Sequence, residues 1–559
     1  MMDNNDNPER SKSSLRVDQA NVFYNYTIGF EAPYIDLVGT AKNLVKNGIT
    51  RTVFFSDFKF LYTDTNEKLQ LDWIQPKGRQ WDSEWHVQFS PKVPEAAITD
   101  LSLAMEVSFH EERIEGPDVR QSAPYLRASL PPIVLESDDF TLPLFVSVKI
   151  FADGIAILSF QLDTTWDGID ENDFISNIVN LFQFYFKRIW TDSRIQRRDA
   201  EELIPNAFQD EMSIAGVDFR SRKTNRLVKK MRKESQETLN KALNEQGKLF
   251  DICNEEWILH EIVGSKNQNS WESTFELCRS QYTNAMLGLI VHTQDKRKLR
   301  EGLSLIWQGR PSISLMRFSD QPTTKSELLS RFTPSLSKIL MRSAEIENPT
   351  ELPPDLRPFE DQCFHGNRAL LLWTWLRPDD EPDNVWDDPN IRAKIMQNQA
   401  RTEHIEYHNM CTVRACAWAK SPPSGDHLKE AYKTLAFTED LIHHSSQAGE
   451  ISDALAYLME AFGTLKLVPS GKETARWYLD ELRYRSDRSR NRMDRLITFV
   501  FGVVGASGLA DFVIRPFLIA AWPGLSNISV PIIAFGIASL IVFFVGIIIW
   551  LFTKTGYEN

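Results

Sequence analysis

The sequence predicts an α+β body, made of a mixed sheet plus helices, followed by a long helix and a two-helix transmembrane hairpin. Runs of β-branched and aromatic residues predict strands early in the chain, and 3.6-residue periodicity predicts helices in its later part. Two long apolar stretches lie within the last 65 of the 559 residues. We therefore expect segments at 1–21, 22–215, 216–350, 351–490 and 491–559.

The first segment, residues 1–21, is polar and charged, and it has no apolar run of the kind that a secretory signal contains. We expect a disordered lead. After it, three stretches predict strands because they are rich in β-branched and aromatic residues: TVFFSDFKFLY (52–62), WHVQFSP (85–91) and LSLAMEVSFH (101–110). An Asp-Gly turn at Asp153 and Gly154, between LPLFVSVKIF and IAILSFQL, predicts a hairpin.

Helices are expected next. Helical spacing of apolar residues predicts one helix over 171–190, which completes an α/β layer in 22–215. The pattern over 216–350 is helical, and RLVKKMRKESQETLNKALNEQ is its clearest part. The Pro-rich stretch 345–362 predicts a connector and a boundary, ALLLWTWL (369–376) predicts a buried strand, and helices fill most of 390–467.

Charge and cysteine content restrict the location and partners of the body. The net charge of −13 argues against nucleic-acid binding, which usually needs a basic surface. Five scattered cysteines do not suit a disulfide framework and indicate a reducing compartment. We expect a cytosolic body that binds no nucleic acid.

The second apolar stretch, 531–552, has 22 consecutive uncharged positions. At about 1.5 Å per residue it measures roughly 33 Å, enough to cross a bilayer. The first stretch is apolar over 496–510 and then carries Asp511 and Arg515. Each charge costs on the order of 2.5 to 3.5 kcal/mol at the membrane centre, so we expect the two to pair, near an interface or facing a protein-lined interior.

The positive charges predict the orientation of the hairpin. Six arginines lie on the upstream side and Lys554 follows the second span, whereas the connecting turn has no Lys or Arg beyond Arg515. By the positive-inside rule, the N-terminal body and the C-terminus both face the cytoplasm. The sequence predicts a multi-pass protein of the cell inner membrane, in contact with the lipid bilayer. The arginines are Arg483, Arg485, Arg488, Arg490, Arg492 and Arg495.

Two patterns indicate self-association. Residues at 3-4-3-4-3 spacing before the membrane form a short helix-packing stripe, and small residues line the first span. The small residues suit either contact between copies or contact between the two spans of one chain, and both alternatives stay open. The stripe is Leu479, Leu482, Ser486, Ser489, Met493 and Leu496, and the small residues are Gly502, Gly505, Ala506 and Gly508.

The large body, the charged helix entering a first span, the short outer turn and the second span with a basic tail resemble the membrane part of the CorA-like divalent metal ion transporter family. The stretch Met493-Asp494-Arg495-Leu496-Ile497-Thr498 is similar to the family's Met-x-x-Leu-Thr entry. The resemblance covers about 440–557 and is one of architecture more than of motif.

The resemblance implies a homo-oligomer, a pentamer in that family, whose first spans line a pore for a divalent cation. Thr498, Ser507, Asp511 and Arg515 are then the candidate pore and membrane-mouth residues. The family's Gly-Met-Asn signature is absent near the turn, and its expected place is close to Arg515, which would repel a divalent cation. A pore of other selectivity, a gated leak and a non-conducting sensor are alternatives.

Eight cations lie within the fourteen residues 220–233. Clustered guanidinium groups bind phosphate, which predicts a small phosphorylated ligand as a partner, but a solvated helix start balanced by the acidic residues that follow also explains the cluster. The candidate ligand-binding residues are Arg220, Arg222, Lys223, Arg226, Lys229 and Lys230.

Two groups could hold a metal. His404, His408 and Cys411 recur at helical spacing and have side chains that suit zinc, although a packed helix face explains them too. The acidic stretch 379–388 offers carboxylates to Mg²⁺ or Ca²⁺, although it lacks EF-hand spacing and suits a hydrated turn.

No phosphate-binding loop, dinucleotide fingerprint, nucleophile elbow or paired Cys-x-x-Cys occurs in the chain, so we predict no enzyme activity. The first hypothesis is a CorA-like homo-oligomeric ion transporter or channel gated by its large cytoplasmic domain. The alternative is a membrane-tethered signalling or defence effector that senses a phosphorylated small ligand and perturbs the membrane. A third is a membrane-anchored metallo-enzyme that uses His404, His408 and Cys411.

Overall fold

The computed structural model divides the chain into two compact units, Met1–Glu473 and Thr474–Asn559, which are described separately. The expected segments 22–215 and 216–350 thus fall in one unit, with most of 351–490. The structure describes residues 15–30, 34–64, 66–74, 89–115, 122–138, 140–199, 222–244, 247–252, 255–262, 274–291, 306–346, 351–376, 389–522, 524 and 529–555.

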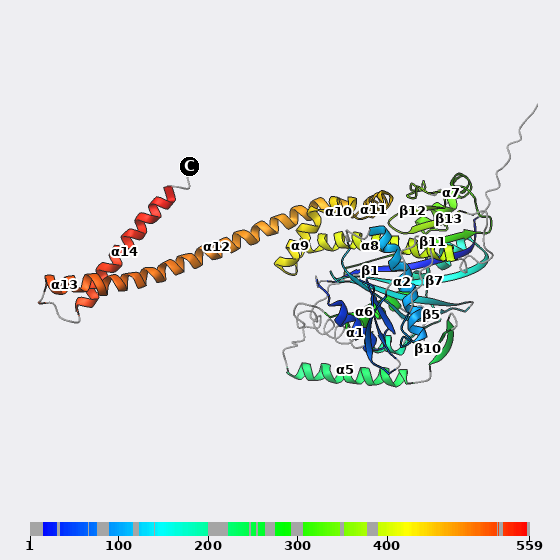
Figure 1. Ribbon diagram of the computed structural model, residues 1–559, viewed down its shortest axis with the longest axis horizontal. Helices are drawn as coiled ribbons and strands as arrows, with labels where there is room; N and C mark the ends of the chain where they lie inside the picture. Colours follow the sequence, from blue (N-terminus) through cyan, green and yellow to red (C-terminus); the bar gives the residue numbers. More distant parts are fainter. Residues whose placement is uncertain are drawn as a thin grey trace, which may run out of the picture. The chain divides into compact units, whose positions relative to one another are not determined.

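The first unit is built on one mixed sheet, which confirms the predicted class of the body (Figure 1). Its main path runs β12-β13-β11-β1-β7-β6-β5-β2-β3-β4, and β8, β9 and β10 pair beside β5. Among the described strands, β11 and β13 pair in parallel and the other neighbours are antiparallel. The strands are β1 (Arg16–Gly29), β2 (Thr52–Phe55), β3 (Lys59–Thr63), β4 (Leu69–Trp73), β5 (Tyr125–Glu136), β6 (Thr141–Phe151), β7 (Ile155–Asp170), β8 (Arg188–Thr191), β9 (Lys248–Ile252), β10 (Glu255–Glu261), β11 (Ile306–Phe318), β12 (Gln362–Gly366) and β13 (Leu371–Trp375).

Several predicted strands are confirmed. The hairpin of β6 and β7 turns at Gly154, whose φ of 88° suits glycine. The stretch 52–62 forms β2 and β3, and β13 is the buried strand predicted within 369–376. The lead is shorter than expected because β1 starts at Arg16 and pairs with β7 and β11. Residues 1–14 and most of 85–91 lie outside the described residues.

Three predictions of local structure are wrong in whole or in part. Residues 101–110 belong to helix α2 (Glu95–Glu115), in which Leu101, Ala104 and Val107 are buried at helical spacing. The helix expected over 171–190 is helical only in its first part, as α3 (Glu171–Asp173), the π-helix η1 (Phe174–Val179) and the 3-10 helix η2 (Leu181–Gln183). Strand β8 follows because it pairs with β5 and β10. In the supposedly helical part 216–350, β11 lies between β1 and β13 in the sheet. Pairing with strands that are distant in the sequence places β8 and β11 in the sheet.

Helices pack on both faces of the sheet. On one face, residues of α1 (Leu37–Lys46), α6 (Phe275–Leu287) and α7 (Lys325–Met341) join the largest core. On the other face, α8 (Pro389–Lys420) and α2 pack against Phe23 of β1 and Leu315 of β11 (Figure 1). The helices α9 (Gly425–Ala436), α10 (Thr438–His443) and α11 (Gly449–Ala461) confirm the helical character predicted for 390–467.

The second unit holds most of α12 (Val468–Leu509), then the π-helix η6 (Ala510–Ile514), α13 (Arg515–Ala521) and α14 (Ser529–Thr555). Among the described residues, one helical stretch, Val500–Ala521, is long and apolar enough to cross a membrane. A second apolar stretch, Ser529–Val545, is shorter. The structure therefore supports a helical C-terminal region with one candidate span.

Candidate functional site

The four candidate pore residues lie along the helical run of the second unit. Thr498 and Ser507 belong to α12; the Ser507 side chain is exposed, and the side chain of Thr498 lies outside the described residues. Asp511 lies in η6, and Arg515 starts α13. Arg515 Nη1 is 3.7 Å from Asp511 Oδ1, and their side chains are 48% and 60% exposed. The predicted i, i+4 pair is present.

The exposed pair lies on a helical run that packs elsewhere through small residues. Ala506 and Ala510 are buried together with Val530, Ala534 and Ala538 of α14. A Cβ at Gly502 would meet Val542 Cγ1 at 3.6 Å, whereas nothing lies within 4 Å of a Cβ at Gly505 or Gly508. Part of the small-residue surface therefore serves contact between the two helices of one chain, and Gly505 and Gly508 lie outside that contact.

Large apolar side chains of the second unit are unusually exposed. Phe501, Phe512 and Phe517 are 72%, 85% and 71% exposed, and Ile532 of α14 is 70% exposed. Large exposed apolar side chains indicate a membrane or an interaction site when they gather in one region of a folded protein.

The basic cluster forms an exposed helix surface where it is described. Arg220 lies outside the described residues, as do the side chains of Arg222 and Lys223. Arg226, Lys229 and Lys230 are exposed on α5 (Arg222–Leu243). Lys230 lies 3.6 Å from Glu234, and Lys233 lies 3.6 Å from Glu237, both i, i+4 pairs. These pairs fit the solvated-helix interpretation.

The proposed zinc ligands lie on α8 but do not converge. The His404 and His408 rings are 4.5 Å apart, whereas the Cys411 thiol lies 3.9 Å from Asp153 Oδ2 of the β6–β7 turn. Burial raises the pKa of Cys411 above its usual range. Within the described part of the chain, the group of three that could hold a metal is a different one, Asp355, Cys363 and His365. The acidic stretch 379–388 lies outside the described residues.

A buried charge network that the sequence reasoning missed lies between the sheet and its α2–α8 layer. Arg127 of β5 donates to Glu403 of α8 at 2.9 and 2.5 Å and to Glu111 of α2 at 2.8 Å. Lys149 of β6 lies 2.5 Å from Glu111 and 4.2 Å from the Tyr125 ring centroid. These four charged side chains are at most 10% exposed. The network balances two cations with two anions.

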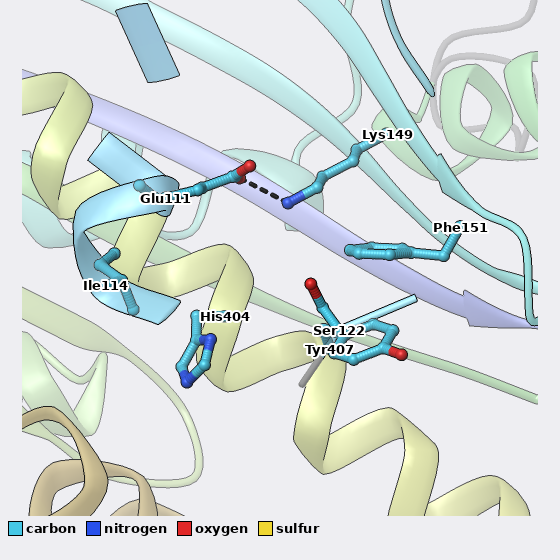
Figure 2. Close-up of a pocket in the computed structure, with 8 residues that line it drawn as sticks. Glu111, Ile114, Ser122, Lys149, Phe151, His404 and Tyr407 are labelled. Carbon is cyan, nitrogen blue, oxygen red and sulfur yellow. Dashed lines mark hydrogen bonds and ion pairs between the residues drawn. The ribbon is translucent and has the colours of Figure 1, made fainter. Parts of the chain in front are cut away.

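The network shifts the pKa values of its two carboxyl groups. Burial raises the pKa of Glu403, but Arg127 and Lys149 outweigh burial and hold this pKa at about 2. Burial raises the pKa of Glu111 against the same two cations. Figure 2 shows the Glu111 and Lys149 side chains pointing toward one another beside His404 and Tyr407 of α8. The cavity there measures about 10 Å³, room for about one water, so the network suits structure better than ligand binding.

Comparison with known proteins adds no assignment. No family model, curated protein or solved structure matches the chain. Its own residues must therefore carry the functional argument. A charge inside an apolar strand, as at Arg127 and Lys149, was the signal in the sequence that could have revealed the buried network.

Proposed function

We propose that this protein is a homo-oligomeric membrane protein whose C-terminal helices form an ion pathway gated by its large body. The observation that carries the proposal is the exposed Asp511–Arg515 pair on a helical run with exposed Phe501, Phe512 and Phe517. The resemblance of the tail to CorA-like transporters supports the same function.

The apolar and charged surfaces of the second unit need different surroundings. Lipid suits the exposed phenylalanines, but it does not suit a charge pair, because charges within a membrane face protein or water. In one chain, α14 covers the side of Ala506 and Ala510 and leaves Asp511 and Arg515 exposed. Other copies of the same helix, surrounding a water-filled interior, would give the pair the polar environment that it needs.

Gating would pass through α12. This helix runs for 42 residues from Val468 to Leu509, into the run that carries Asp511. A rotation or tilt of the helix would change the position of the charge pair, as helix shifts do in other gated proteins. In this proposal the body and both chain ends face the cytoplasm and α14 is the second span of the hairpin.

Ion flux in liposomes tests the proposal. We expect purified protein to conduct ions, Arg515→Gln to shift selectivity toward cations and Asp511→Asn to shift it toward anions, each by about tenfold, equivalent to roughly 1.4 kcal/mol. Arg485→Gln is the matched control because Arg485 forms an i, i+4 pair with Glu481, at 2.7 Å, before the span. An ion selectivity that is unchanged in both variants, or no flux under any condition, would count against the pathway.

A further inference from the structure

Asp355, Cys363 and His365 converge from two adjacent segments of the first unit. Cys363 and His365 are two apart on β12, so both side chains leave the same face of the strand. Backbone and side-chain bonds hold Asp355 against β12: Phe364 N donates to Asp355 Oδ1 at 2.8 Å, and Leu356 N donates to Phe364 O at 2.8 Å. One ligand atom from each of the three residues lies within 4.8 Å of the others.

One ring nitrogen of His365 is available as a ligand. Its Nδ1 lies 2.9 Å from the carbonyl oxygen of Pro353, which can only accept, so Nδ1 carries the proton. The lone pair of the neutral ring is then on Nε2. His365 is 1% exposed, and Nε2 is buried without a hydrogen-bond partner in the described part of the chain. Metal-binding histidines commonly use this arrangement, in which a carbonyl fixes the distal nitrogen.

Cys363 and Asp355 add two further donors. Cys363 is fully buried, and burial raises the pKa of its thiol to about 12, so the thiol is neutral without a metal. Asp355 Oδ2 accepts from Lys325 Nζ at 2.6 Å, so the ammonium group balances the carboxylate. The side chains of Asp355 and Lys325 are 17% and 16% exposed, which leaves a route from solvent to the carboxylate.

We propose that Asp355, Cys363 and His365 bind a divalent transition-metal ion of the Zn²⁺ class. Thiolate and imidazole favour such an ion over Mg²⁺ or Ca²⁺, which prefer oxygen ligands. Tetrahedral zinc places its sulfur and nitrogen ligands about 3.5 Å apart, so the three donors, which lie within 4.8 Å of one another, move closer together on binding, and water can take the fourth position. On binding, the Cys363 thiol loses its proton to solvent and Lys325 leaves Asp355. The site does not depend on the proposed ion pathway.

Cobalt titration of the full-length protein in detergent, after treatment with a chelator, tests the site. We expect one equivalent of Co²⁺ to produce a thiolate-to-cobalt absorption band, and Zn²⁺ to remove it by displacement. Cys363→Ser abolishes the band, and His365→Gln weakens cobalt binding by about tenfold to a hundredfold or more. Cys416→Ser is the matched control, because Cys416 is another buried thiol in the first unit, and it keeps the band.

A gain-of-affinity variant keeps the test independent of folding defects. Lys325→Met removes the competing ammonium group and should tighten cobalt binding by about tenfold, roughly 1.4 kcal/mol. An absent band in the wild-type protein, or a band unchanged by Cys363→Ser, would overturn the proposal. Unchanged cobalt affinity in Lys325→Met would overturn it as well.

Discussion

Glu403 of α8 accepts hydrogen bonds from both terminal nitrogens of Arg127 on β5, at 2.9 and 2.5 Å. The same guanidinium donates to Glu111 of α2 at 2.8 Å. The Arg127 side chain therefore connects the sheet to both α2 and α8. Three residues along α8, Glu406 lies 2.6 Å from Arg310 of β11, so α8 is held at two successive positions by buried ion pairs.

The first prediction is that Arg127→Met destabilises the protein by about 3 to 5 kcal/mol, because it leaves Glu111 and Glu403 buried with one cation. Thermal unfolding of the full chain in detergent, followed by tryptophan fluorescence, measures the loss. The control is Lys187→Met, since Lys187 pairs with Asp138 at 2.6 Å but the two side chains are 48% and 71% exposed. Lys187→Met should lower the free energy of unfolding by only about 0 to 1 kcal/mol. Equal losses in both variants would contradict a role for burial.

The network shows which parts of the fold the sequence could predict. Apolar strands such as β6 and β13 were predictable because alternation and composition are local. The partners of Arg127 were not, because Glu403 is 276 residues away in the chain and α2 was interpreted as a strand. Likewise, β11 could not be assigned from its own residues, since its neighbours β1 and β13 come from distant segments.

The second prediction concerns pH. Burial raises the pKa of Asp199 to about 6, and its carboxylate accepts from Asn284 Nδ2 at 2.8 Å. The folded state therefore binds a proton more tightly than the unfolded state, and this group costs stability as pH rises from about 4 to 6. Asp199→Asn should be nearly neutral at pH 4 and stabilising by up to about 3 kcal/mol at pH 8. Thermal unfolding at both pH values checks this; a stabilisation independent of pH would contradict it.

The third prediction concerns the contact between the helices of the second unit. Ala534 is 1% exposed and is buried together with Ala506 and Ala510. Ala534→Leu should therefore overpack the contact between the helices and destabilise it by about 1 to 3 kcal/mol. The rate of proteolysis of the C-terminal helices in detergent measures the loosening. Gly505→Ala is the control, because a Cβ there meets nothing within 4 Å. Equally fast cleavage in Gly505→Ala would show that the loosening does not come from overpacking at Ala534.

In the second unit, sequence and structure agree on the charge pair because an i, i+4 spacing on a helix is a local relationship. The contacts of the small residues in the first span could not be predicted, because spacing alone does not show which helix each residue contacts. The structure assigns Ala506 and Ala510 to α14 and leaves Gly505 and Gly508 open. The proposed site of Asp355, Cys363 and His365 was not predicted because Asp355 lies within the Pro-rich stretch 345–362, whose composition predicts only a connector and a boundary.

The last prediction is that removing one charge of the second unit harms membrane integration more than removing both. Arg515→Ala leaves Asp511 alone, and a single charge in a span costs on the order of 2.5 to 3.5 kcal/mol, so the fraction of protein that resists alkaline extraction should fall. Asp511→Ala with Arg515→Ala removes the charges together and should restore that fraction. Arg485→Ala, before the span, should change nothing. If the double variant were extracted as readily as the single one, an unpaired charge within the candidate span would not explain the loss.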